Sequence, residues 1–64
     1  MKVKAPQAVI DGIEEVRKSG KTNMFDRRAV QYWADKNEAF ETVCWLEEHP
    51  REYGQGLFNG FEPE

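Results

Sequence analysis

The chain has 64 residues, 12% of them aromatic, and a net charge of −3. A chain this short forms one domain and buries only about 60% of the surface that its unfolded state exposes, which leaves little room for an enclosed active site. It contains one cysteine, Cys44, and one histidine, His49, so neither an intramolecular disulfide nor the usual Cys/His zinc site can form within one chain. No apolar run is long enough for a membrane span, and we expect a cytoplasmic protein that binds no metal and no cofactor.

The first predicted helix spans residues 6–18. Pro6 suits its first turn, where the missing N–H costs nothing. The apolar residues that follow recur at helical spacing: Val9, Ile13 and Val16. The pattern stops at Ser19-Gly20, where glycine adopts a left-handed cap conformation at little cost. Gly12 interrupts the helix at a cost of about 1 kcal/mol relative to alanine, so either the helix is weak there or another backbone approaches it closely.

The second predicted helix spans residues 26–36. Asp26 is the candidate N-cap, and Asn23 competes with it for that role. Phe25 and Val30 have the spacing of a hydrophobic staple around this cap. The apolar stripe of the helix consists of Val30, Trp33 and Ala34.

The third predicted helix spans residues 38–48. Its apolar face consists of Ala39, Phe40, Val43 and Leu46. Trp45 projects from another face, among glutamates, and is therefore expected to be exposed. His49-Pro50 ends this helix, and a short fourth helix over residues 50–58 is possible, although Gly54 and Gly56 weaken its pattern.

We expect the tail, residues 59–64, to fray. No segment alternates between apolar and polar residues as a strand does. The prediction is therefore an all-α fold, a three- or four-helix bundle with short loops in a single domain over residues 1–64.

Five cations surround the joint between the first two predicted helices: Arg17, Lys18, Lys21, Arg27 and Arg28. Residues 1–28 carry seven basic and four acidic residues, against two and eight in residues 29–64, so the joint is a basic patch on an acidic chain. Together with backbone N–H groups at the start of the second helix, these cations are suited to holding an anion. The candidate ligand- or partner-binding residues are Lys21, Thr22, Asn23, Arg27, Arg28 and Tyr32.

Two known motifs bear on this joint. Gly20-Lys21-Thr22 has the last letters of a nucleotide-binding loop, but Glu15 stands where that loop needs a glycine, which argues against a nucleotide hydrolase. A helix-turn-helix is the alternative, with base contacts from residues of the second helix: Arg27, Arg28, Gln31 and Tyr32. The long connection and the acidic chain make DNA the less favoured partner.

Groups for catalysis are sparse. Cys44 and His49 would lie about 140° apart around a helix, so they cannot form a nucleophile–base pair, and we expect Cys44 to be a small core residue. The carboxylates of Glu47, Glu48 and Glu52 are typical of a solvated face. We therefore expect that the protein is not an enzyme.

The remaining indication is the set of eight aromatic residues, more than a bundle of this size buries easily. Trp45, Tyr53 and Phe58 are the candidate interface residues, and they favour a homo-oligomer because aromatic side chains often anchor interfaces. Alternatively, the C-terminal segment folds back over Trp45 and completes an ordinary core.

From the first turn of the first predicted helix to Tyr53, the chain resembles a family of small uncharacterised proteins encoded by bacteriophages and prophages. The matching segments are Ser19-Gly20-Lys21-Thr22-Asn23-Met24-Phe25-Asp26, Ala29-Val30-Gln31, Glu47-Glu48 and Glu52-Tyr53. The resemblance implies a phage accessory protein with no assigned activity, which would work in the cytoplasm of an infected or lysogenic bacterium. Combined with the basic joint, it favours a host-defence antagonist that binds a host factor or an anionic nucleotide signal as a homo-oligomer. A helix-turn-helix transcriptional regulator is the alternative.

Overall fold

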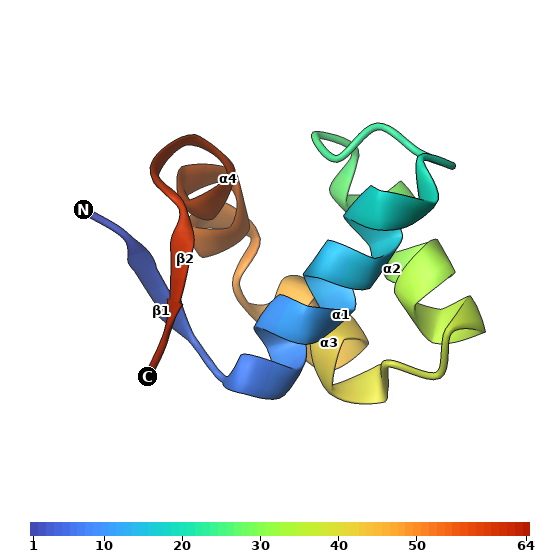
Figure 1. The fold of residues 1–64 in the computed structure, drawn as a ribbon, viewed down its shortest axis with the longest axis horizontal. Helices are drawn as coiled ribbons and strands as arrows, with labels where there is room; N and C mark the ends of the chain where they lie inside the picture. Colours follow the sequence, from blue (N-terminus) through green and yellow to red (C-terminus); the bar gives the residue numbers. More distant parts are fainter.

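The computed structural model describes all residues 1–64 and is mostly helical, with one small sheet (Figure 1). Along the chain the elements are β1 (Val3–Ala5), α1 (Gln7–Ser19), α2 (Arg27–Lys36), α3 (Phe40–Glu48), α4 (Pro50–Asn59) and β2 (Phe61–Pro63). The predicted helices are therefore present, including the fourth, although the third begins at Phe40 and not at residue 38. No helix has the combination of length and apolar character that crossing a membrane requires.

Local caps explain where α1 ends and α2 begins. Gly20 adopts the left-handed conformation with φ 66°, and its N–H donates to Arg17 O, as the sequence predicted. Asp26 caps α2, because its Oδ1 accepts a hydrogen bond from the N–H of Ala29 at 3.2 Å. Asn23, the other candidate for this N-cap, does not cap α2. Its Oδ1 accepts from the N–H of Phe25 at 2.9 Å and so shapes the turn before the helix.

The turn between α2 and α3 contains a strained residue. Glu38 has φ 62°, in the left-handed region that favours glycine. The N–H of Glu38 donates to Asp35 O and that of Ala39 donates to Ala34 O, which is the hydrogen-bond pattern of a Schellman motif. This motif reverses the chain within three residues and lets α3 pack directly against α2.

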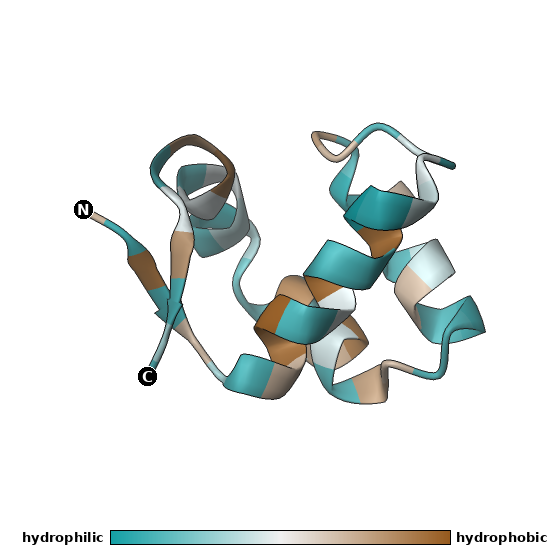
Figure 2. Cartoon of the chain, in the orientation of Figure 1, coloured by the Kyte–Doolittle hydropathy of each residue, from teal (hydrophilic) through white to brown (hydrophobic).

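The core is formed by residues of all four helices and β1, and hydrophobic segments of α1 and α3 lie close together where these two helices cross (Figure 2). The buried apolar residues of the core are Ala5, Val9, Ile13, Val16, Val30, Ala34, Trp45, Leu46 and Tyr53. At the crossing, Gly12 faces the fully buried Thr42, whose Oγ1 would lie 2.0 Å from a Cβ on Gly12. Gly12 thus marks a close approach, made by a side chain of α3 and not by its backbone.

The apolar face predicted for α3 is right only in part, since Leu46 is buried and Ala39 and Val43 are half-buried against the core. The buried residues of α3 are Thr42, Trp45 and Leu46, whereas Phe40 is 58% exposed and Cys44, expected in the core, is exposed. The reason is tertiary, because α3 packs against α1, α2 and α4 and has no single inward face. Periodicity within one helix cannot reveal such contacts.

The prediction that residues 59–64 fray is wrong for Phe61–Pro63, which forms strand β2. The fold is therefore helical but not strictly all-α. Phe61–Pro63 pairs in parallel with Val3–Ala5, in the register Val3 to Phe61 and Ala5 to Pro63. The N–H of Val3 donates to Gly60 O at 2.9 Å, and the N–H of Glu64 donates to Ala5 O at 3.2 Å. The sheet brings the two terminal segments side by side next to α4, at the end of the molecule away from α2, with the N- and C-termini at its opposite ends (Figure 1).

Trp45 lies under this C-terminal segment and is only 8% exposed, so its predicted exposure is wrong. The ring of Phe61 meets it edge-on, with centroids 6.1 Å apart, and His49 stacks on it at 4.8 Å. Tyr53 is 2% exposed. Of the three candidate interface residues, only Phe58 is on the surface, where it is 79% exposed.

Candidate functional site

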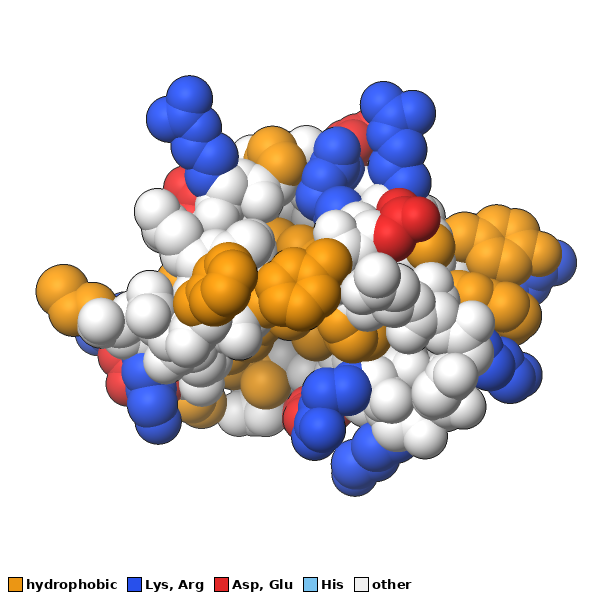
Figure 3. All heavy atoms as spheres, turned by 90° about the horizontal axis from the view of Figure 1, so that it is seen from above, with side chains coloured by type: hydrophobic (Ala, Val, Ile, Leu, Met, Phe, Trp, Pro, Cys, Tyr) orange, Lys and Arg blue, Asp and Glu red, His pale blue; other side chains and the backbone are white.

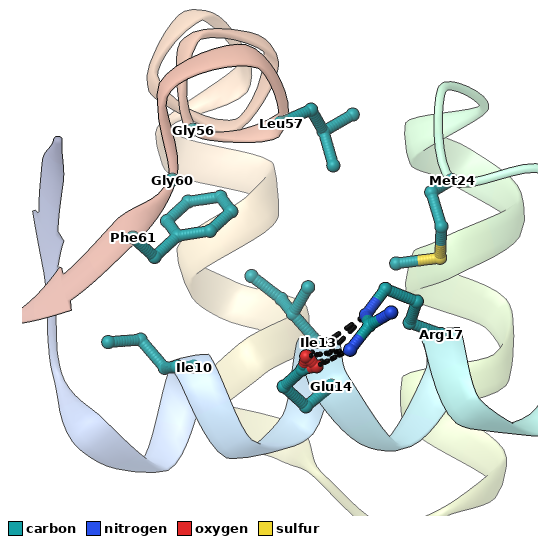
Figure 4. A pocket seen from close by; sticks show the side chains of 9 residues that line it. All are labelled: Ile10, Ile13, Glu14, Arg17, Met24, Gly56, Leu57, Gly60 and Phe61. Atoms are coloured by element: carbon teal, nitrogen blue, oxygen red, sulfur yellow. Dashed lines mark hydrogen bonds and ion pairs between the residues drawn. The ribbon is translucent and has the colours of Figure 1, made fainter.

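A cleft of about 260 Å³ opens between α1 on one side and α4 with the start of β2 on the other (Figure 4). Five of its lining side chains are apolar and come from four segments: Ile10, Ile13, Met24, Leu57 and Phe61. Side chains from distant parts of the sequence thus converge on one concave and mostly apolar surface. Binding sites in proteins are usually concave and mostly apolar, so this cleft is the first candidate for a functional site.

Packing constraints hold the walls of the cleft in place. Gly56 is buried, and a Cβ there would lie 2.2 Å from the ring of Phe61, so the absence of a side chain lets the ring lie against α4. Tyr53 donates its hydroxyl proton to Met24 O and thereby ties the connection between α1 and α2 to α4. Burial of this hydroxyl raises the pKa of Tyr53 to about 12.

An ion pair lies at the edge of the cleft. Arg17 donates from Nε and Nη2 to the carboxylate of Glu14, with the shortest contact at 2.6 Å (Figure 4). These hydrogen bonds hold the pKa of Glu14 below its usual value. Both side chains remain partly exposed, so the pair adds little to stability but gives one rim of an apolar cleft a polar border.

Two exposed phenylalanines stand next to the cleft. Phe25 follows Met24 and is 66% exposed, and Phe58 follows Leu57 and is 79% exposed. Their ring centroids lie 5.7 Å apart, so the two rings form a pair that bridges the connection before α2 and α4. Seen from above, hydrophobic side chains gather in the middle of this face, with Lys and Arg side chains around them (Figure 3).

The structure divides the residues predicted to form a basic anion site. Arg27 turns toward α3, where its Nη1 donates to Gln31 Oε1 at 2.7 Å and Leu46 O at 3.3 Å and lies 3.4 Å from Glu47 Oε2. Gln31 donates in turn to Val43 O at 3.3 Å. Arg27 and Gln31 therefore stabilise the contact of α2 with α3, and neither points freely outward as base readout requires.

The other predicted residues lie on or beside the outer side of α2. Arg28 and Tyr32 are exposed, Lys21 lies over the ring of Trp33 at 4.9 Å, and Thr22 is half-buried. Asn23 uses its side-chain oxygen in the turn described above. Arg27 is thus used within the fold, whereas Arg28 and Lys21 lie on a separate, exposed surface. The cations of the predicted basic joint therefore do not converge on one point.

No group of three or more His, Cys, Asp or Glu side chains is placed to hold a metal ion. Sequence reasoning missed the cleft, although it included Ile13 in the core and paired Phe25 with Val30. The sequence held one indication of the cleft: Ile10 lies beside the apolar stripe of the first helix and is therefore an apolar residue outside the predicted core. The partners of Ile10 come from residues 24, 57 and 61 and cannot be inferred from spacing.

Comparison with known proteins gives a family and no activity. None of the curated proteins and none of the solved structures matches the chain. Residues 6–60 match the model of DUF5049, a domain of unknown function. This match covers α1 to α4 and most of the cleft lining, so the chain belongs to the DUF5049 family of uncharacterised proteins.

Proposed function

We propose that this protein works by binding another protein and not by catalysis, and that the partner inserts a bulky apolar side chain into the cleft between α1 and α4. The observation that carries the proposal is the combination of an apolar cleft with the exposed Phe25–Phe58 pair beside it. Isolated exposed apolar residues are ordinary on a protein surface, but a concave apolar surface with two neighbouring rings is typical of an interface.

The energetics support a protein partner. Burying the exposed part of each phenylalanine would contribute about 2–3 kcal/mol. The partner's own side chain in the cleft would contribute a similar amount, because the lining is mostly apolar. Two or three anchors of this size are enough for a specific interface of modest area, since a few buried residues carry most of the binding free energy.

The resemblance of residues 19–26 to a segment of phage proteins favours a host protein as the partner. We therefore propose a phage accessory protein that antagonises host defence by occupying a surface of a host factor in the bacterial cytoplasm. The role as an antagonist of host defence rests on the sequence resemblance, whereas the choice of the binding surface rests on the geometry of the cleft.

The test compares wild type with Phe58→Ser and with the matched control Phe40→Ser. Phe40 is also an exposed phenylalanine, at 58%, but it lies at the start of α3 and does not line the cleft. A host protein that is captured by the wild type would be purified and titrated against all three by calorimetry. We expect Phe58→Ser to weaken binding about 30-fold, the equivalent of about 2 kcal/mol, and Phe40→Ser to leave it unchanged.

The converse result, with Phe40→Ser weakening binding and Phe58→Ser not, would contradict the choice of surface. Light scattering of the free protein distinguishes a second copy from a host protein. A wild-type dimer that Phe58→Ser converts to a monomer would show that the cleft is covered by a second copy, and the proposal of a host partner at this surface would then be wrong.

A further inference from the structure

We infer that the outward face of α2 is a second binding site, which takes a nucleobase that carries a phosphate, presented on a single strand. Arg28, Tyr32 and Lys36 are spaced by four residues and therefore form one ridge along α2. The ridge lies outside the cleft, none of whose lining residues belongs to α2. The inference is thus independent of the proposed function.

Two aromatic rings meet at this face, each with a lysine against it. Tyr32 belongs to the ridge, and Trp33 lies beside it, half-buried where it packs against the core. Tyr32 is 54% exposed and meets Trp33 edge-on, with centroids 5.2 Å apart and planes at 84°. Lys36 Nζ lies 5.3 Å from the centre of the Tyr32 ring, and Lys21 Nζ lies 4.9 Å from the centre of the Trp33 ring. Arg28 lies one turn before Tyr32 on the same ridge, so two cations lie against the rings and a third stands next to them along the helix.

This combination selects the ligand chemistry. Cation–ring contacts at exposed positions are weak, so an ammonium group readily turns to a phosphate, with which it makes a charge-assisted hydrogen bond. The ring face that it leaves is then free to stack on a base. A carboxylate would use the cations but not the rings, and an apolar ligand would use the rings but not the cations.

The geometry also favours a single strand over a duplex. Arg28 and Lys36 lie eight residues apart, which corresponds to about 12 Å along the helix axis and to the length of two or three nucleotides. In a duplex the faces of the bases are stacked on each other, so they are closed to Tyr32. Asp35 is the only acidic residue of α2, and the ridge is therefore locally positive on a chain with a net charge of −3.

The experiment is a titration followed by tryptophan fluorescence, with Trp33→Phe identifying the signal of Trp33. The probes are a ten-residue oligothymidylate, thymidine monophosphate, a ten-base-pair duplex and inorganic phosphate. We expect the oligothymidylate to quench Trp33 and to bind about 20-fold more weakly at 200 mM than at 50 mM salt, because three phosphate contacts to a single strand predict a slope of about −2.

Three variants locate the site. Tyr32→Ala, which removes a stacking ring, is expected to weaken binding at least 5-fold. Lys36→Gln is expected to weaken it and to lower the salt slope by about 0.7. Arg51→Gln is the matched control, because it removes one exposed positive charge from α4 and is expected to have no effect.

Each outcome decides the inference. Equal quenching by thymidine monophosphate and the oligonucleotide would overturn the assignment of a single strand and identify a free nucleotide as the ligand. Absence of quenching, equal binding of the duplex, quenching by inorganic phosphate alone, or equal losses in Lys36→Gln and Arg51→Gln would each overturn the inference.

Discussion

Replacing Gly12 with alanine separates helix propensity from packing. Gly12 lies inside α1, and propensity alone favours alanine by about 1 kcal/mol. In the folded protein, however, the new Cβ would lie 2.0 Å from Thr42 Oγ1 and 2.9 Å from Thr42 Cβ. Thr42 is fully buried and has no room to turn away, and overpacking of this kind costs about 1–3 kcal/mol. The packing cost cancels or exceeds the gain in helix propensity, so we expect Gly12→Ala to lower the free energy of unfolding by up to about 2 kcal/mol and not to raise it.

The assay is thermal and urea unfolding followed by circular dichroism, in which 1 kcal/mol corresponds to a Tm shift of about 4–8 °C for a domain of this size. Gly54→Ala is the matched control, because Gly54 is also inside a helix but a Cβ there meets nothing within 4 Å. We expect it to raise stability by about 1 kcal/mol. In a Thr42→Ala background the cost of Gly12→Ala should become smaller, since the nearest clashing atom is gone. Equal increases in Tm for Gly12→Ala and Gly54→Ala would refute the close approach of α1 and α3.

Three further predictions concern the turns and the core. Glu38→Gly should raise the free energy of unfolding by about 1 kcal/mol in urea titrations because it relieves a left-handed residue, whereas Asn37→Gly, at φ −83°, should bring no gain. Asp26→Ala should lower it by about 1 kcal/mol through loss of the N-cap, and Asp26→Asn should restore most of the loss. Because burial raises the pKa of Tyr53 to about 12, above its ordinary value of 10, the folded state favours the protonated phenol. The stability from this group is complete below pH 10 and falls as the pH rises toward 12, so melting curves should show a steeper loss for wild type than for Tyr53→Phe over that range, and parallel losses would contradict the burial of the hydroxyl.

Much of the secondary structure was determined by the sequence alone. Gly20, Asp26 and Pro50 act on backbone groups within a few residues of themselves, so the ends of the helices that they flank could be predicted without knowledge of the fold. The buried stripe of α1 could be predicted for the same reason, since one side of that helix carries nearly all of its apolar residues.

The sheet, the buried face of α3 and the cleft were decided by tertiary structure. Pairing of Val3 with Phe61 joins the two ends of the chain, and three-residue strands carry no alternation from which to predict it. That pairing places Phe61 over Gly56 and against Trp45, which buries a tryptophan that helical spacing had placed among glutamates. Contacts between residues far apart in sequence depend on how the whole chain closes on itself, whereas caps and spacing depend only on near neighbours.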